Sequence, residues 1–228
     1  MPVIVLDLPC YNCLTIFTQV IRMLTHKINR TTSEKEKMIH SPLADFIRTL
    51  YPLGKKAEQY IIQNSFHKKI SRSKYLLKPG EFCSYYYYIH KGVLRAFIKE
   101  GKKEITTWIN PENEITTSIR SMSRNEPSLE YIQALENSDL YAMSFESMQK
   151  MYTLFPEMNT VARMLLEEYY AASEERSYIS RLPSAEKRYS HFNATRPELV
   201  NRIPLKYVAS YLGMSEETLS RLRSKKSM

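Results

Sequence analysis

The stretch LKYVASYLGMSEETLSRLRS, residues 205–224, contains the pattern on which the interpretation of this chain depends. It predicts two short helices joined by a tight turn. Val208, Ala209 and Leu212 fall on one face of the first helix, where the small Ala209 permits a close crossing. Gly213 stands in the turn, where a positive φ angle is costly for residues that have a Cβ atom. Since small, glycine and apolar positions all suit this geometry, we predict a helix-turn-helix.

The second helix of this motif has favourable signals at its start. Ser215 can cap its first turn, where the negative charges of Glu216 and Glu217 are also favoured. Leu219 and Leu222 supply its inner face at a spacing of three residues. The opposite face is therefore left for contact with another molecule.

Two charged side chains on that outer face, Glu217 and Arg221, lie four residues apart and project together. Glutamate can accept a hydrogen bond from cytosine N4, and arginine can donate two to guanine O6 and N7. We predict that this pair reads DNA bases from a recognition helix over 215–225. The alternative is an exposed salt bridge between the two side chains.

Other side chains near the same helix are suited to the DNA backbone. Hydroxyls and flexible cations position a protein on phosphates without specifying sequence. The predicted backbone contacts are Ser215, Thr218, Arg223, Lys225 and Lys226. For the basic tail at the end of the chain, the alternative is that its charges are simply exposed to solvent.

Positive charge is concentrated in this part of the chain. The 228 residues include 33 basic and 24 acidic ones, a formal net charge of +9. From Arg181 onward there are ten basic and four acidic residues, so this segment contributes six of the nine positive charges. Such a bias favours contact with nucleic acid.

A long helix is predicted upstream, over residues 156–182. Its pattern positions are Val161, Leu165, Tyr169, Ala172, Arg176 and Ile179. Their spacings of four and three residues approach a heptad seam and predict pairing with a second copy in a homodimer. The alternative is a helix that lies along its own sheet. Pro183 ends the pattern, and Ser184 can cap a following helix.

Residues 42–70 have helical spacing, but a β-rich pattern follows. Short apolar and aromatic segments separated by proline and glycine predict an antiparallel sandwich or roll. The expected strands are 74–78, 85–90, 93–99, 104–109, 131–134 and 140–144. In the tyrosine run 85–88, alternate rings are expected to point inward and outward.

The remaining features exclude several classes. The three cysteines, Cys10, Cys13 and Cys83, are too few for a disulfide framework or a four-thiolate cluster, so no metal or cofactor is expected. Glycine-rich phosphate loops, catalytic triads and HExxH motifs are absent, so we do not expect an enzyme. Without an 18-residue apolar run, no membrane span is expected, and a cytoplasmic location is predicted.

The order of a β-roll, a long helix and a C-terminal helix-turn-helix resembles the Crp/Fnr family of bacterial regulators. LLKPGE at 76–81 and YIHKGV at 88–93 look like its first sensor strands, and ITTWINPE at 105–112 like the strand leading to its ligand cassette. MSEETLSR at 214–221 is similar to its recognition helix. Glu217 and Arg221 match the family's base-reading positions. The resemblance covers about residues 42–226.

This resemblance implies an α+β chain with a cupin-like, cyclic-nucleotide-binding-like antiparallel β-roll as sensor, a dimerisation helix and an all-α helix-turn-helix domain. The expected divisions are an N-terminal extension over 1–37, the roll over 38–155, the long helix over 156–182 and the DNA-binding domain over 183–228. For the extension, translation beginning at Met38 is the alternative. Implied partners are double-stranded DNA, a second copy, a small-molecule effector and, as a candidate, RNA polymerase.

The chain departs from the cyclic-nucleotide-binding members of the family. They carry a Gly-Glu pair for the ribose and an Arg-Ser pair for the phosphate, where this chain has ITTS at 115–118 and EPSL at 126–129. Pro127 stands in place of the arginine, so cAMP is not expected, and the effector is unassigned.

Three other departures concern the cysteines, the recognition helix and the end of the chain. Three cysteines do not match the iron–sulfur branch, and Glu216 replaces an arginine of the cAMP-responsive members. The end at Met228 resembles a short branch that lacks a β-wing. The alternative function is an effector-binding module that acts through protein partners without specific DNA binding.

Overall fold

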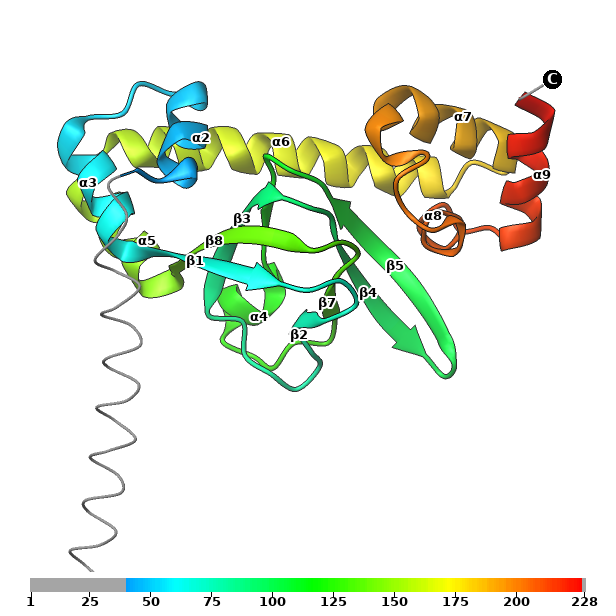
Figure 1. Cartoon of the computed structure of the whole chain (residues 1–228), viewed down its shortest axis with the longest axis horizontal. Helices are drawn as coiled ribbons and strands as arrows, with labels where there is room; N and C mark the ends of the chain where they lie inside the picture. Colours follow the sequence, from blue (N-terminus) through cyan, green and yellow to red (C-terminus); the bar gives the residue numbers. More distant parts are fainter. Residues whose placement is uncertain (1–39, 227–228) are drawn as a thin grey trace, which may run out of the picture. The chain divides into compact units, whose positions relative to one another are not determined.

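The computed structural model describes residues 40–226 of the chain (Figure 1). The expected N-terminal extension, with Cys10 and Cys13, lies outside the described residues. The described part is α+β, with two four-stranded antiparallel sheets and helices before and after them, which confirms the predicted fold class. No helix in this part of the chain is long and apolar enough to cross a membrane.

Two helices, α2 (Pro42–Leu50) and α3 (Lys55–Asn64), precede the sheets. Pro42 occupies the first turn of α2, where its missing N–H costs no hydrogen bond. The prediction of helix up to residue 70 is wrong, because β1 (Ser65–Ile70) is a strand. It pairs along its whole length with β8 (Ser138–Ser144). The distant partner supplies the hydrogen bonds, and the local sequence SFHKKI does not reveal this pairing.

The two sheets have the strand orders β1-β8-β3-β6 and β2-β7-β4-β5. The remaining strands are β2 (Tyr75–Leu77), β3 (Tyr85–Lys91), β4 (Leu94–Glu100), β5 (Lys103–Asn110), β6 (Ile115–Thr116) and β7 (Tyr131–Ala134). All six predicted strands are present, whereas β1 and the two-residue β6 were not predicted.

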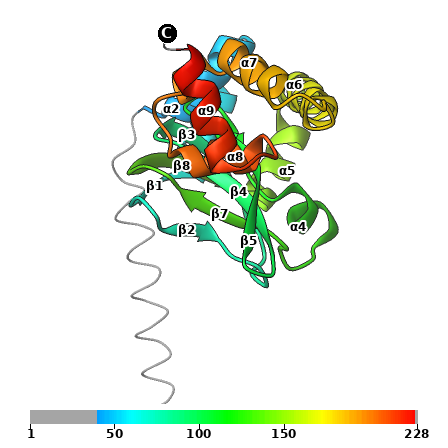
Figure 2. The ribbon, with the colours of Figure 1, turned by 90° about the vertical axis from the view of Figure 1, so that its right-hand side faces the viewer.

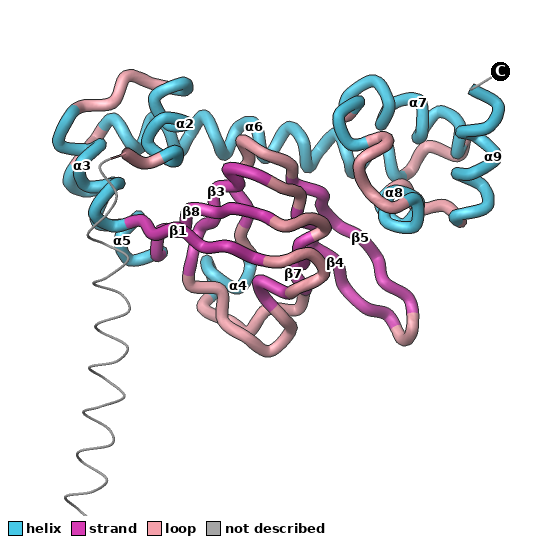
Figure 3. Tube along the Cα trace, viewed as in Figure 1, coloured by secondary structure: helices cyan, strands magenta, loops and turns pink. Residues whose placement is uncertain are grey.

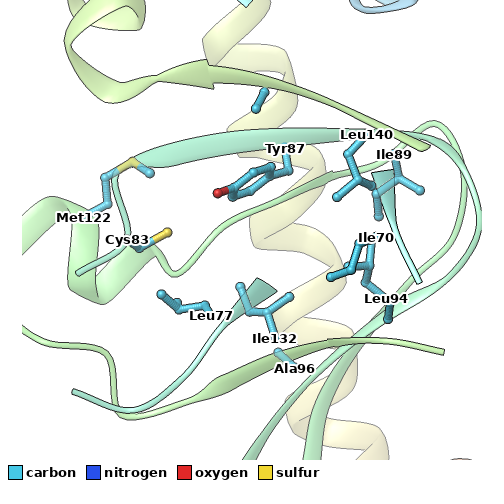
Figure 4. Close-up of a cluster of buried hydrophobic side chains, with 12 residues drawn as sticks. Ile70, Leu77, Cys83, Tyr87, Ile89, Leu94, Ala96, Met122, Ile132 and Leu140 are labelled. Carbon is cyan, nitrogen blue, oxygen red and sulfur yellow. The ribbon is translucent and has the colours of Figure 1, made fainter. Parts of the chain in front are cut away.

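Side chains of both sheets meet in the interior of the roll (Figure 4). Ile89 and Leu140 come from one sheet and Leu94 and Ile132 from the other, and all four are almost fully buried. This apolar cluster fills the space between the sheets, so the roll is held together mainly by burial of apolar surface.

The tyrosine run alternates as predicted. Tyr87 belongs to the cluster inside the roll, and Tyr88 belongs to a second cluster on the outside of the sheet. There Tyr88 stacks on Phe46 of α2, with ring centroids 4.8 Å apart. The outward ring is therefore covered by a helix.

The other helices are α4 (Ile119–Arg124), α5 (Phe145–Leu154), α6 (Glu157–Ser180), α7 (Ala185–Thr195), the 3-10 helix η1 (Pro197–Leu199), α8 (Leu205–Tyr211) and α9 (Glu216–Lys226) (Figure 3). The first two were not predicted. Ser144 caps α5 by accepting a hydrogen bond from the Ser147 amide at 3.0 Å.

The predicted seam of α6 contacts its own chain. Val161 is buried with residues of α2 and α5, and Ile179 is also buried. Tyr169 stacks on Trp108 of β5, with ring centroids 4.6 Å apart. Val161 and Ile179 are therefore covered by their own chain, as in the alternative of a helix that lies along its own sheet, whereas Tyr169 remains 36% exposed and the pairing of α6 with a second copy stays a prediction.

Candidate nucleic-acid interface

The helix-turn-helix consists of α8, a turn and α9 (Figure 2). Val208 and Ala209 of α8, Leu212 of the turn and Leu219 of α9 are buried in one cluster, as the sequence predicts. Gly213 has a φ of +63° in the turn, a left-handed conformation that favours glycine. The local pattern thus produces the expected inner face.

A third helix, α7, completes this small core. Ser184 caps α7 as expected, accepting a hydrogen bond from the Lys187 amide at 3.2 Å. Tyr189 and Phe192 of α7 pack in the same cluster as Leu219. Because three helices share one core, the start of α9 is held at a defined position.

The start of α9 is closed by local hydrogen bonds. The Ser215 hydroxyl accepts from the Thr218 amide at 3.2 Å, and the two hydroxyls lie 3.1 Å apart. Hydrogen bonds from Ser215 and from the Glu217 amide, with a contribution from the charge of Arg221, lower the pKa of the Glu217 carboxyl. This carboxylate is therefore ionised and can act only as an acceptor at neutral pH.

The predicted base-reading side chains, Glu217 and Arg221, are both exposed. No ion pair joins them within residues 40–226, so the salt bridge considered as the alternative is not formed in the free chain. Their outer face is open, and the assignment to DNA bases stays a prediction.

The side chains predicted to contact the DNA backbone differ in their solvent exposure and in their hydrogen bonds to the rest of the chain. Lys225 is exposed. Arg223 donates a hydrogen bond to the side chain of Asn201, so it is partly held by its own chain. The structure describes the backbone of Lys226 but not its side chain.

The other side of the motif is attached to the roll. Ser210 of α8 accepts a hydrogen bond from the Thr106 amide of β5 at 2.9 Å and donates one to the Glu104 carbonyl at 2.9 Å. These bonds use backbone groups on the edge strand β5, which pairs only with β4 in its sheet. Helix α8 thus covers part of an otherwise open edge.

A buried arginine strengthens this contact. Arg95 of β4 is 1% exposed, and its guanidinium carbon lies 4.0 Å from the ring centroid of Phe97 and 3.8 Å from that of Tyr207 in α8. It donates to Gln133 Oε1 at 3.0 and 2.8 Å and forms an ion pair with Glu104. A single arginine within an apolar strand gave no signal of this role in the sequence.

Surface charges add further links between the roll and the helices that follow. Arg202 binds Glu112 at 2.8 Å and Glu136 at 2.8 Å, and Arg196 binds Glu114 at 2.6 Å. The hydrogen bond from Arg202 lowers the pKa of Glu112 to about 2. The roll therefore holds α8 and the segment before it through two backbone groups of β5, the guanidinium of Arg95 and three carboxylates.

The loops around α4, which the sequence resemblance matches to a ligand cassette, contain buried polar side chains. Ser118, Ser121 and Ser128 are buried, and the Ser118 hydroxyl donates to Glu130 Oε1 at 2.7 Å. Burial raises the pKa of the Glu130 carboxyl. In this region the Ser118 hydroxyl is therefore already bonded to a carboxyl group of the chain.

The chain was compared with protein-family models, curated proteins and solved structures. No protein-family model matches the chain, and no curated protein matches it. Among solved structures, the c-di-GMP-responsive global regulator CLP from Xanthomonas campestris superimposes with a TM-score of 0.61 at 14% identity, covering 76% of this chain and 92% of that one.

Two further structures are similar. A CooA mutant from Carboxydothermus hydrogenoformans has a TM-score of 0.61 at 14% identity, covering 84% of this chain and 86% of that one. A protein from Eubacterium rectale, described as a transcriptional regulator of the Crp/Fnr family, has a TM-score of 0.60 at 18% identity, covering 76% and 85%. The chain has the fold of the Crp/Fnr regulators.

Proposed function

We propose that the chain is a DNA-binding transcription regulator that places α9 in the major groove. One observation carries this proposal: Glu217 and Arg221 face outward while Leu219, on the same helix, is fully buried. An exposed, polar outer face on a helix anchored by its inner face is the arrangement that DNA reading requires. The neighbouring Ser215, Thr218, Arg223, Lys225 and Lys226 are proposed to contact phosphates.

We propose that α6 pairs two copies through the face opposite the one that contacts the roll. Leu166, Tyr170 and Tyr178 on that face are 60%, 69% and 55% exposed. They lie four and eight residues apart and so form one stripe. Pairing would bury these side chains and present two recognition helices to successive major grooves, about 34 Å apart.

The proposed domains have the expected boundaries: the roll over 38–155, the long helix over 156–182 and the DNA-binding domain over 183–228. A cyclic nucleotide is not the proposed effector, because the cassette holds Glu130 and lacks an arginine at Pro127. We expect the dimer to act on DNA in the cytoplasm, where RNA polymerase is a candidate partner.

Selection of DNA sites from a random library by the purified full chain tests the DNA-binding proposal. We expect enrichment of a two-fold symmetric sequence whose half-sites are centred about 10 base pairs apart. A footprint on the selected site should be protected on both half-sites. Recovery of no enriched sequence would contradict the proposal and favour a module that acts through protein partners.

A matched pair of variants tests the dimer. Leu166→Arg places a charge in the exposed stripe, whereas Glu168→Arg places the same side chain at an exposed position about 200° away around the helix. Sedimentation should show a monomer for the first variant and a dimer for the second. A dimer in both cases would mean that α6 does not pair through this stripe.

A further inference from the structure

A cavity of about 60 Å³ lies where the end of α6 meets α7, Trp108 of β5 and Tyr211 of α8. Three arginines line it, Arg176, Arg188 and Arg196, against one acid. It is separate from the cassette of the roll, which is formed around α4 and Glu130.

Arg176 of α6 reaches into this cavity without a carboxylate partner among the described residues. Its guanidinium carbon lies 3.1 Å from the ring centroid of Trp108. The Nη1 atom is buried and has no hydrogen-bond partner, whereas Nη2 has a long bond of 3.4 Å to Ser173, and the side chain also interacts with the Tyr211 hydroxyl. Burial lowers the pKa of this arginine, as expected for a cation removed from water.

Arg188 of α7 also has an unsatisfied atom. Its Nε is buried without a hydrogen-bond partner. The terminal nitrogens donate to the backbone carbonyls of Leu182 and Pro183 and, at 3.5 Å, to that of Gly213. This arginine therefore ties the α6–α7 connection to the turn of the helix-turn-helix, with no carboxylate to balance its charge in the described part of the chain.

The remaining charged groups of the lining are already paired. Arg196 is bound to Glu114 at 2.6 Å, and Glu175 is bound to His191 at 2.7 Å. The uncompensated positive charge of the cavity thus resides on Arg176 and Arg188.

Buried guanidinium nitrogens without partners are costly, and such atoms commonly mark the place of a bound water or ion. The planar fork of arginine matches carboxylate and phosphate oxygens. We propose that this cavity binds a small oxyanion, the carboxylate or phosphate group of a metabolite, with Arg176 and Arg188 as donors and Trp108 and Tyr211 as walls.

The position of this site gives it a regulatory consequence, which rests on the proposed function. The strand β5 belongs to the roll, α6 is the long helix, and α7 and α8 belong to the DNA-binding part. An anion bound between them stabilises this arrangement by mass action and holds α9 at its present position relative to α6. Accordingly, the site is a candidate for the effector.

The single tryptophan of the chain is Trp108, so its fluorescence reports directly on the cavity. The full chain is titrated with inorganic phosphate and, separately, with acetate at constant ionic strength, and the heat of binding is measured in parallel. We expect a saturable signal with one anion per chain for at least one of the two. The two titrations distinguish a phosphate from a carboxylate.

Two glutamine variants locate the bound anion. Arg176→Gln should raise the dissociation constant at least tenfold, measured by heat because the substitution itself alters the surroundings of Trp108. Arg120→Gln removes the same charge from α4, beside the cassette of the roll, and should change the constant less than twofold. If Arg176→Gln does not fold, Arg176→Lys, which keeps the charge but loses the fork, should raise the constant severalfold.

Three results would overturn the proposal: no saturable response to either anion, unchanged affinity in the Arg176 variant, or an equal loss in the Arg120 variant. None of these measurements involves DNA. Failure here therefore leaves the proposed DNA binding intact, and a failed DNA selection leaves the anion site intact.

Discussion

Helices α8 and α9 belong to one helix-turn-helix, yet their environments differ. Helix α8 is bound to the roll through Ser210 and Tyr207, and its partners include a fully buried arginine, Arg95. The outer face of α9 carries Glu217 and Arg221, which are exposed and form no ion pair with each other in the described structure.

This difference shows how, among the described residues, the roll can position α9 without forming hydrogen bonds or ion pairs with its outer face. The hydrogen bonds, ion pairs and cation–π contacts with the roll described above come from α8 and from the segment before it, whereas α9 is held through Leu219 in the shared core. Substitutions on the two helices should therefore separate into effects on stability and effects on DNA affinity.

The largest expected effect is on the α8 side. Arg95→Met removes one partner of a buried ion pair and leaves Gln133 Oε1 without its donor. Since Glu104 is partly solvated, the loss should be near the lower end for a broken buried pair, about 3 kcal/mol of unfolding free energy. Urea unfolding measures it.

Lys99→Met is the matched control, because Lys99 lies on the same strand, 4.0 Å from the same Glu104, but is exposed. Its cost should stay below about 1 kcal/mol, as for surface ion pairs. Equal losses in the two variants would mean that the burial of Arg95 does not increase its contribution to the free energy of unfolding.

The next effect is on the α9 side. Arg221→Ala should weaken binding to the selected DNA site by about 1–3 kcal/mol and relax its sequence preference. The free energy of unfolding should hardly change, since the side chain is exposed. Binding to the selected site and to single-base variants of it measures the change.

Lys225→Ala provides the comparison on the same helix. It should weaken all sequences alike and reduce the slope of affinity against salt by about 0.9. A uniform loss in both variants would contradict the assignment of base reading to Arg221.

A smaller effect is expected at Ser210. Ser210→Ala leaves the Thr106 amide and the Glu104 carbonyl without their partner, at a cost of about 1–2 kcal/mol. Ser220→Ala, at an exposed position of α9, should leave unfolding unchanged. If the two variants were equally stable, α8 would not depend on this link to β5.

The smallest effect concerns acid. The pKa of Glu112 in the folded chain is about 2, below its ordinary value of 4.5, because Arg202 binds the ionised form. Its contribution to stability is therefore complete above about pH 4.5 and is lost as the pH falls toward about 2. Glu112→Gln should make the urea midpoint fall less steeply over this range.

Glu126→Gln serves as the control, since Glu126 is an exposed carboxylate whose arginine partner, Arg120, is also exposed. It should leave the pH profile close to that of the unchanged chain. Identical profiles for all three proteins would show that the Arg202 link does not stabilise the fold.

Two sequence-based interpretations depended on contacts that only distant residues make. The helical spacing up to residue 70 was misleading because β1 obtains its hydrogen bonds from β8, more than sixty residues away. The seam of α6 was amphipathic as expected, but the spacing of an amphipathic helix does not say which partner covers it. Here Val161 is covered by α2 and α5, and Tyr169 stacks on Trp108 of β5.

The sequence by itself determined the parts whose geometry is local: the strands bounded by proline and glycine, the positive φ at Gly213, and the inner and outer faces of α9. These follow from φ preferences, capping and the period of the helix, which act within a few residues. The tertiary structure alone decided which face of α6 is buried, that Arg95 anchors α8, and that Arg176 and Arg188 share a cavity. Those outcomes depend on pairings between residues far apart in the chain, whose burial is known only once the elements pack together.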